Sequence, residues 1–397
     1  MKVLIMPSWY PNPNNRSGYF FKEQAHFLNQ NGFNIKVLMA EELHTKSYYF
    51  QRLKRFLNGA TNKLTTSFLE QDPEAFSFPV IIQKSWSDEK KLKEMDKAYV
   101  TAFKKLTNKL NWFPDIIHLQ GMYKYGFSSY VIAEKYKLPL VVIEHSPFSM
   151  RNYSEAQQER IRKIFKISSK IAGVSHFHKA CLAVFDTKRE LEVVWNFMDE
   201  QKFSCDTNLK LDDVFVITII LRAESIKGPI IFFDAIARFI EIYKKGKPVK
   251  VNVVGLSCLE DLTNMKGIDN NFISKYDNLH PILKFYSWLD RNKIEKLYQK
   301  SSVFLSTSKE ETYGVALREA MLCGVPVIST CSGGPEDTIN EDTGLLVAIG
   351  DIENIAQSIL AIYDGDISFR PQQLRDYVIS QSGRKAYLKR MKDFYNV

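Results

Sequence analysis

The chain has 397 residues, 45% of them hydrophobic and 25% charged, and its formal net charge is +9. This length suits two domains that each bury their own core, and the composition is that of a globular protein. No apolar run approaches the roughly 18 residues that a membrane-spanning helix needs, and the N-terminus lacks the shape of a signal peptide. The five cysteines are scattered and form no C-x-x-C pair. Reduced thiols and a cytoplasmic location are therefore expected.

Short apolar runs alternate with helical patterns along the first half of the chain. Strands are predicted at 2–6, 34–39, 80–83, 116–119, 140–144, 171–174 and 192–195. The segments 20–31 and 125–135 show the apolar spacing of helices. Such alternation predicts an α/β domain with a doubly wound parallel sheet.

The alternation restarts after a polar stretch at 199–213. Strands are predicted at 214–221, 249–254, 282–285, 303–306, 325–329 and 345–348. A second α/β domain is therefore expected, with domain 1 at 1–203 and domain 2 at 204–383. A final helix is predicted at 384–397, because Tyr387, Met391 and Phe394 recur at helical spacing.

The most informative segment contains Glu311 and Glu319 in an E-x7-E arrangement. The apolar run 303–306 before it predicts a buried strand, and 314–323 predicts a helix that Gly324 closes. A strand that enters a helix through a glycine turn directs the first helical N–H groups outward, where they bind anions. Carboxylates beside such an anion site would hold sugar hydroxyls, so the segment predicts a nucleotide-sugar site.

This segment resembles the E-x7-E motif of the retaining family-4 glycosyltransferases, which have the GT-B fold. Five further segments resemble family landmarks in the same order along the chain. They are 9–18, 194–199, the Arg-x4-Lys-Gly sequence 222–228, 325–336 and 343–347. The resemblance implies two Rossmann-like domains that face each other across a cleft, with the last helix crossing back to domain 1. Domain 1 would bind the acceptor and domain 2 the nucleotide sugar.

The resemblance also assigns residues to the donor site of domain 2. Arg222 and Lys227 would neutralise the diphosphate, so that no metal or other cofactor is required. Glu311 would hold hydroxyls of the transferred sugar, and Glu319 would hold the ribose hydroxyls. The remaining donor-binding residues are Gly255, Tyr313, Gly314, Val315 and Ala316.

In domain 1 the resemblance points to His145 as a catalytic residue near the 6-position of the sugar. A lone histidine is more often structural, and His118, which ends a neighbouring strand, is the alternative to it. Gly18 would let the backbone approach a phosphate or sugar, or it is a plain turn glycine. Glu144 is the first-domain carboxylate to test for a double displacement.

Basic residues mix with aromatic or apolar ones at 48–57, 90–109 and 160–170. Such runs are usually solvated surfaces. The functional alternative is peripheral docking on the anionic inner face of the cell membrane. No helix-turn-helix, zinc or RNA-binding signature accompanies the charge, so nucleic acid is not expected as a partner.

Together these observations predict a retaining glycosyltransferase of the hexosyltransferase type that uses a UDP-linked sugar. Its acceptor would be a lipid-linked or growing surface polysaccharide, because the first loop resembles those of bacterial capsule, lipopolysaccharide and exopolysaccharide transferases. A non-catalytic subunit that binds a nucleotide sugar or a partner transferase is one alternative. A sugar-nucleotide epimerase is another. The sequence alone does not identify the sugar, the acceptor or the linkage.

Overall fold

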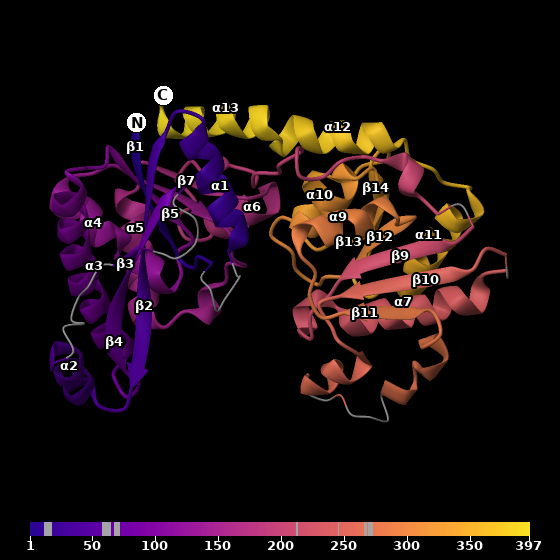
Figure 1. Ribbon diagram of the computed structural model, residues 1–397, viewed down its shortest axis with the longest axis horizontal. Coiled ribbons are helices and arrows are strands. Elements are labelled where there is room, and N and C mark those ends of the chain that lie inside the picture. Colours follow the sequence, from indigo (N-terminus) through magenta and orange to yellow (C-terminus); the bar gives the residue numbers. More distant parts are fainter. Residues whose placement is uncertain are drawn as a thin grey trace. The chain divides into compact units, whose positions relative to one another are not determined.

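The computed structural model describes residues 1–11, 18–57, 65–66, 72–211, 213–244, 246–265, 268 and 273–397 (Figure 1). The chain divides into two compact units. Unit 1 comprises Met1–Val174, His178–Val194 and Leu388–Val397, and unit 2 comprises Ser175–Phe177 and Trp195–Tyr387. In the described part of the chain, no helix is long and apolar enough to cross a membrane.

Unit 1 is built on an eight-stranded sheet with the order β3-β4-β2-β1-β5-β6-β7-β8. All neighbouring strands pair in parallel except β3 and β4. The strands are β1 (Lys2–Pro7), β2 (Asn34–Thr45), β3 (Thr65–Thr66), β4 (Glu74–Gln83), β5 (Ile116–Gln120), β6 (Leu140–Glu144), β7 (Lys170–Gly173) and β8 (Glu192–Val193). Strands β5 and β6 are buried along their whole length, as expected where both faces of a parallel sheet are covered.

The helices of unit 1 connect these strands and supply its apolar core. They are α1 (Tyr19–Gln30), α2 (Tyr48–Leu57), α3 (Asp88–Leu110), α4 (Ser129–Tyr136), α5 (Glu155–Ile167) and α6 (His176–Ala183). The core gathers the buried faces of α3 and α5 with residues of the central strands. The predicted helix 125–135 is a short 3-10 turn, Lys124–Ser128, followed by α4.

Unit 2 is built on a six-stranded parallel sheet with the order β11-β10-β9-β12-β13-β14. The strands are β9 (Phe215–Ile220), β10 (Val249–Val254), β11 (Leu283–Tyr286), β12 (Val303–Ser306), β13 (Val327–Thr330) and β14 (Gly344–Val347). The strand order reverses between β9 and β12, and ligands of open α/β sheets bind outside the carboxyl ends of the strands at such a reversal.

Helices cover both faces of this sheet, with α9 and α10 on one face and α7 on the other (Figure 1). The helices of unit 2 are α7 (Pro229–Ile242), α9 (Arg291–Gln299), α10 (Val315–Leu322), α11 (Ile352–Asp364) and α12 (Pro371–Ser382). The predicted fold of two doubly wound Rossmann-like sheets is thus confirmed.

The division between the units lies after Val194, earlier in the chain than the predicted boundary at 203/204. The segment after Val194 groups with unit 2 because α12 holds it: Arg375 donates to the carbonyl of Glu200 at 2.6 Å and to that of Phe203. The last helix, α13 (Arg384–Tyr395), starts in unit 2, and residues from Leu388 onward group with unit 1.

Candidate functional site

The E-x7-E segment forms a turn at the carboxyl end of β12. The backbone N–H of Glu311 donates to Ser332 at 2.8 Å, and the N–H of Gly334 donates back to Glu311 at 2.7 Å. Gly314 then caps α10 with φ of 82°, a left-handed conformation that other residues adopt only at a cost. The first amides of α10 follow directly and supply the positive end of a helix dipole.

Lys227 and Glu311 form an ion pair at this turn. Lys227 Nζ lies 2.6 Å from Glu311 Oε2, and the two side chains are 22% and 21% exposed. Gly228 makes the approach possible, since a Cβ at this position would lie 2.0 Å from the carbonyl oxygen of Thr307. The Thr307 hydroxyl donates to the Gly228 carbonyl at 3.0 Å, so the lysine loop is fixed on the end of β12.

Two further predicted residues lie at the carboxyl edge of the same sheet. Arg222 follows β9, and its side chain is 64% exposed with the guanidinium 3.5 Å from Glu224. Gly255 follows β10 and packs on the chain after β9, because an added Cβ would lie 2.1 Å from the carbonyl of Leu221. The structure therefore brings Arg222, Lys227 and the motif turn to one edge, where the side chains of Lys227 and Glu311 are in direct contact.

Glu319 occupies a more enclosed position than Glu311. Its side chain is 8% exposed and forms an ion pair with Arg291 at the start of α9. The Tyr298 hydroxyl lies 3.3 Å from the other carboxylate oxygen, and burial raises the pKa of this tyrosine, so the hydroxyl stays protonated and donates. The pair Arg291 and Tyr298 was not foreseen from the sequence.

Tyr313 and Arg318 support the turn from inside unit 2. The ring of Tyr313 is 1% exposed, and its hydroxyl donates to the carbonyl of Asn196 at 3.0 Å. The buried guanidinium of Arg318 lies over this ring and donates to the carbonyls of Tyr313 and Gly334. Burial lowers the pKa of Arg318 from its usual value. A ligand can therefore reach Tyr313 only through its backbone, and Arg318 is a positioning residue that the sequence analysis missed.

The candidates in unit 1 lie at the carboxyl ends of its strands. His145 follows β6 and is packed against Phe20 and Phe21, with ring centroids 5.5 Å and 4.7 Å away. Gly18 starts α1 and packs against Trp9, although most of the loop before it, residues 12–17, lies outside the described residues. These contacts place the imidazole beside the first turns of α1.

Glu144 precedes His145 and is fully buried. Its carboxylate accepts backbone N–H groups of Met122, His145 and Ser146, the last two at 2.9 and 2.8 Å. Burial raises the pKa of Glu144, and this effect is larger than the opposite effect of the hydrogen bonds. Because its oxygens are engaged by three backbone groups, Glu144 holds the loop after β6 and is poorly placed to attack a substrate.

His118, the alternative to His145, lies in the interior of unit 1. It is 0% exposed, and Nδ1 lies 2.7 Å from the hydroxyl of Tyr395 in α13. Burial lowers its pKa to about 3, so the imidazole is neutral at physiological pH. This histidine ties the C-terminal residues to the sheet of unit 1, which is a structural role.

Two Rossmann-like sheets with a polar site at the carboxyl edge of the second are typical of one class of protein, the transferases that use nucleotide-linked substrates. The family model described as "Glycosyl transferases group 1" matches residues 214–365. That range covers every strand of unit 2 and both glutamates of the motif.

Two relatives of known activity are also named for the transfer of sugar groups. The chain is 24% identical over 270 residues to the N-acetyl-alpha-D-glucosaminyl L-malate synthase of Bacillus anthracis, covering 64% of this chain and 66% of that protein. It is 23% identical over 352 residues to the UDP-Gal:alpha-D-GlcNAc-diphosphoundecaprenol alpha-1,3-galactosyltransferase of Escherichia coli, covering 83% and 85%.

Among solved structures, HepE of Anabaena in complex with UDP and glucose has the same fold. The TM-score is 0.72 at 17% identity, over 100% of this chain and 99% of that one. The comparisons support a glycosyltransferase of the GT-B, family-4 type, as the resemblance predicted from the sequence. The solved structure shows the shared fold.

Proposed function

We propose that this glycosyltransferase transfers a hexose from a UDP-linked sugar with retention of anomeric configuration. The observation that carries the proposal is the Lys227–Glu311 ion pair beside the amino end of α10. The lysine and the amides of the helix would bind a diphosphate, and the carboxylate would accept hydrogen bonds from sugar hydroxyls. UDP is also the nucleotide in the HepE complex and in the name of the Escherichia coli relative, which supports this choice of donor.

In the mechanism we propose, the acceptor hydroxyl oxygen forms a bond to the anomeric carbon while the bond from that carbon to the diphosphate oxygen breaks. The acceptor proton passes to the departing phosphate oxygen on the same face, so no strong protein base is required. Arg222, Lys227 and the amides of Gly314, Val315 and Ala316 stabilise the charge that develops on the diphosphate. These residues supply the countercharge, and we expect transfer without a metal.

The two glutamates then have separate tasks. Glu311 would hold hydroxyls of the transferred sugar once the diphosphate attracts Lys227. Glu319 has lone pairs beyond those that Arg291 and Tyr298 use, and ribose hydroxyls would donate to these. We retain His145 of unit 1 as the candidate for orienting the sugar.

Thermal unfolding with a panel of nucleoside diphosphates tests the donor site. A ligand far above its dissociation constant adds a few kcal/mol of apparent stability, so UDP should raise the melting temperature more than ADP or GDP. The increase should be lost in Arg222→Ala. No increase with any nucleotide in the folded protein would refute the donor site and favour the non-catalytic subunit.

The acceptor we propose is a lipid-linked or growing surface polysaccharide. The Escherichia coli relative is named for a diphosphoundecaprenol acceptor, which supports this class. Incubation of the UDP-sugar with and without such an acceptor also tests the epimerase alternative, because an epimerase would convert the donor when no acceptor is present.

Helix α2 supports a position at the inner membrane face. Tyr49, Phe50, Leu53 and Leu57 are 81%, 63%, 56% and 73% exposed, and their spacing places them along one side of the helix. An exposed apolar stripe on a chain of net charge +9 is complementary to an anionic bilayer.

Sedimentation with phosphatidylglycerol vesicles tests this docking, with phosphatidylcholine vesicles as the uncharged comparison. Replacing Leu53 and Leu57 by Glu should abolish binding. The control is Val184→Glu, which changes a valine of unit 1 that is 73% exposed outside α2. Equal binding by all variants would contradict a role for α2.

A further inference from the structure

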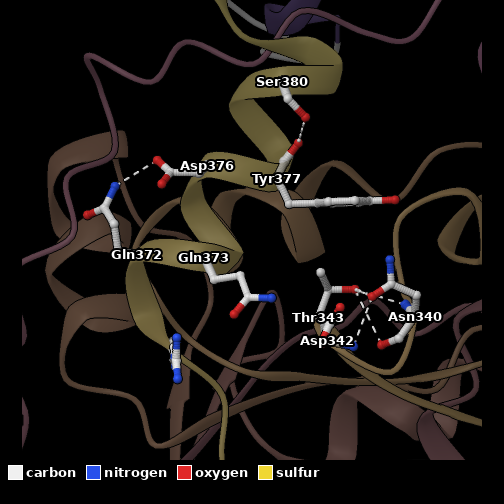
Figure 2. A pocket seen from close by; sticks show the side chains of 9 residues that line it. Asn340, Asp342, Thr343, Gln372, Gln373, Asp376, Tyr377 and Ser380 are labelled. Atoms are coloured by element: carbon white, nitrogen blue, oxygen red, sulfur yellow. Dashed lines mark hydrogen bonds between the residues drawn. The ribbon is translucent and has the colours of Figure 1, made fainter.

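Unit 2 contains a cavity of about 570 Å³, lined by polar and charged residues, between α12 and the loop that leads into β14. Its walls include Asn340 and Thr343 from the loop, and Gln373, Asp376 and Tyr377 from α12 (Figure 2). This volume is in the range of small-molecule sites. No role in the donor chemistry proposed above is assigned to these residues.

The cavity lies at the opposite edge of the sheet from the donor site. Thr343 directly precedes β14, and the start of β14 pairs with the start of β13. The loop 340–343 is therefore at the amino end of the strands, whereas Lys227 and Glu311 lie in loops that follow the carboxyl ends of β9 and β12. A ligand in this cavity would not compete with the nucleotide.

The charges of the lining exclude several classes of ligand. Arg370 is the one cation among the lining residues, against the carboxylates of Asp342 and Asp376. This balance disfavours phosphates and other anions. A lipid is disfavoured too, because every lining residue carries an amide, a hydroxyl or a charged group.

Several polar groups are held in place with hydrogen-bonding capacity left over. Gln372 donates to Asp376 at 2.7 Å, which leaves the carboxylate with unused lone pairs. Within the described part of the chain, the side chains of Arg370 and Gln373 and the hydroxyl of Tyr377 form no hydrogen bond. In Figure 2 the ring of Tyr377 is seen edge-on, with Asn340 and Thr343 on one of its sides.

We propose that this cavity, named here the α12 pocket, binds a neutral saccharide. Paired amide and carboxylate groups match the alternating donors and acceptors of neighbouring sugar hydroxyls, and an aromatic face packs against the C–H face of a sugar ring. Given the proposed function, on which this inference rests, the saccharide is a segment of the glycan acceptor or product. The α12 pocket would hold a growing chain on the enzyme between transfers.

Hydrogen bonds hold the loop and the end of α12 that flank the α12 pocket, so this backbone is ordered before a ligand arrives. The Thr343 hydroxyl donates to the carbonyl of Thr338 at 2.8 Å, and the Thr338 hydroxyl donates to Gln381 of α12 at 3.1 Å. At the end of α12, Ser382 shares a hydrogen bond of 2.6 Å with Tyr313. Little ordering of this backbone is required on binding, which lowers the entropic cost of capturing a flexible glycan.

Ligand-observed NMR on the full chain, without nucleotide, tests the α12 pocket. The probes are maltotriose, chitotriose and N-acetyllactosamine. At least one should bind with a dissociation constant on the order of 1 mM. Tyr377→Ala and Gln373→Ala should each weaken that binding about tenfold or more, while the control Gln357→Ala, which changes an exposed amide on α11, should not.

Saturating UDP should leave saccharide binding unchanged, and so should Lys227→Met. The inference is overturned if none of the three probes binds, if UDP displaces the bound probe, or if binding survives both pocket substitutions. The proposed function can fail separately: saccharide binding lost with Tyr377→Ala, in a protein that binds no nucleotide, would support the α12 pocket and refute the donor site.

Discussion

Replacing Lys227 by Met should weaken the binding of UDP by roughly 2- to 30-fold. A charge-assisted hydrogen bond from the ammonium to a phosphate oxygen contributes about 1.5–3 kcal/mol. Part of this is offset, because Lys227 must first leave Glu311, and an ion pair of partly exposed side chains contributes about 0.2–1 kcal/mol. The side chains are 22% and 21% exposed, so the upper part of that range applies. With an offset near 1 kcal/mol the net loss is about 0.5–2 kcal/mol, which gives the stated factor.

Isothermal titration of UDP into the wild type and Lys227→Met at one fixed salt concentration measures this change. The control is Lys300→Met, which removes an exposed lysine after α9, at the amino end of β12. Circular dichroism checks that each variant is folded. A dissociation constant within about twofold of the wild type in folded Lys227→Met would refute the assignment of this lysine to the diphosphate.

Three further predictions concern the glutamates and the buried histidine. Glu311→Gln should lower the transfer rate on the order of 100-fold while the affinity for UDP is retained, as a comparison of kcat with the UDP dissociation constant will show. Arg291→Met removes the guanidinium that neutralises Glu319, whose side chain is 8% exposed, so the unfolding free energy of unit 2 should fall by about 3 kcal/mol. Hydrogen exchange of the α10 amides should become faster as a result. Unchanged exchange would contradict the Arg291–Glu319 ion pair. For His118, burial lowers the pKa from 6.5 to about 3, so the unfolded chain binds a proton that the folded chain does not between these values. Between pH 6.5 and about 3, the unfolding free energy should therefore fall by about 1.4 kcal/mol for each pH unit of acidification. In His118→Gln the slope of unfolding free energy against pH should be smaller by the contribution of about one proton.

The sequence was sufficient to predict the order and type of nearly all sheet elements, because buried parallel strands are short, continuous apolar runs. It underestimated β2, which continues to Thr45, where polar residues follow the apolar run. It also missed β3, a two-residue strand without an apolar signal. Both strands are stabilised by pairing with β4, a contact between distant segments that periodicity does not reveal.

For the site, the sequence indicated which residues gather at the carboxyl edge of unit 2 but not how they pair. The Lys227–Glu311 contact joins residues from two separate loops. Arg291 and Tyr298 lie on α9, where nothing in the local pattern distinguishes them from surface or core residues. Tyr313 stands next to the glycine cap, and only tertiary packing determines that its ring is directed inward, away from a ligand.

In the proposed donor site, Arg318 lies behind the turn, and we expect it to affect the thermodynamics of nucleotide binding. Its guanidinium holds the carbonyls of Tyr313 and Gly334, and these residues flank the backbone that presents the amides of α10. A diphosphate bound as proposed would meet donors that are already aligned, and little conformational entropy would remain to be lost on binding. The enthalpy of UDP binding should accordingly come from contacts with the phosphates and little from loop rearrangement. Substitution of Arg318 should weaken UDP binding mainly by making the binding entropy less favourable.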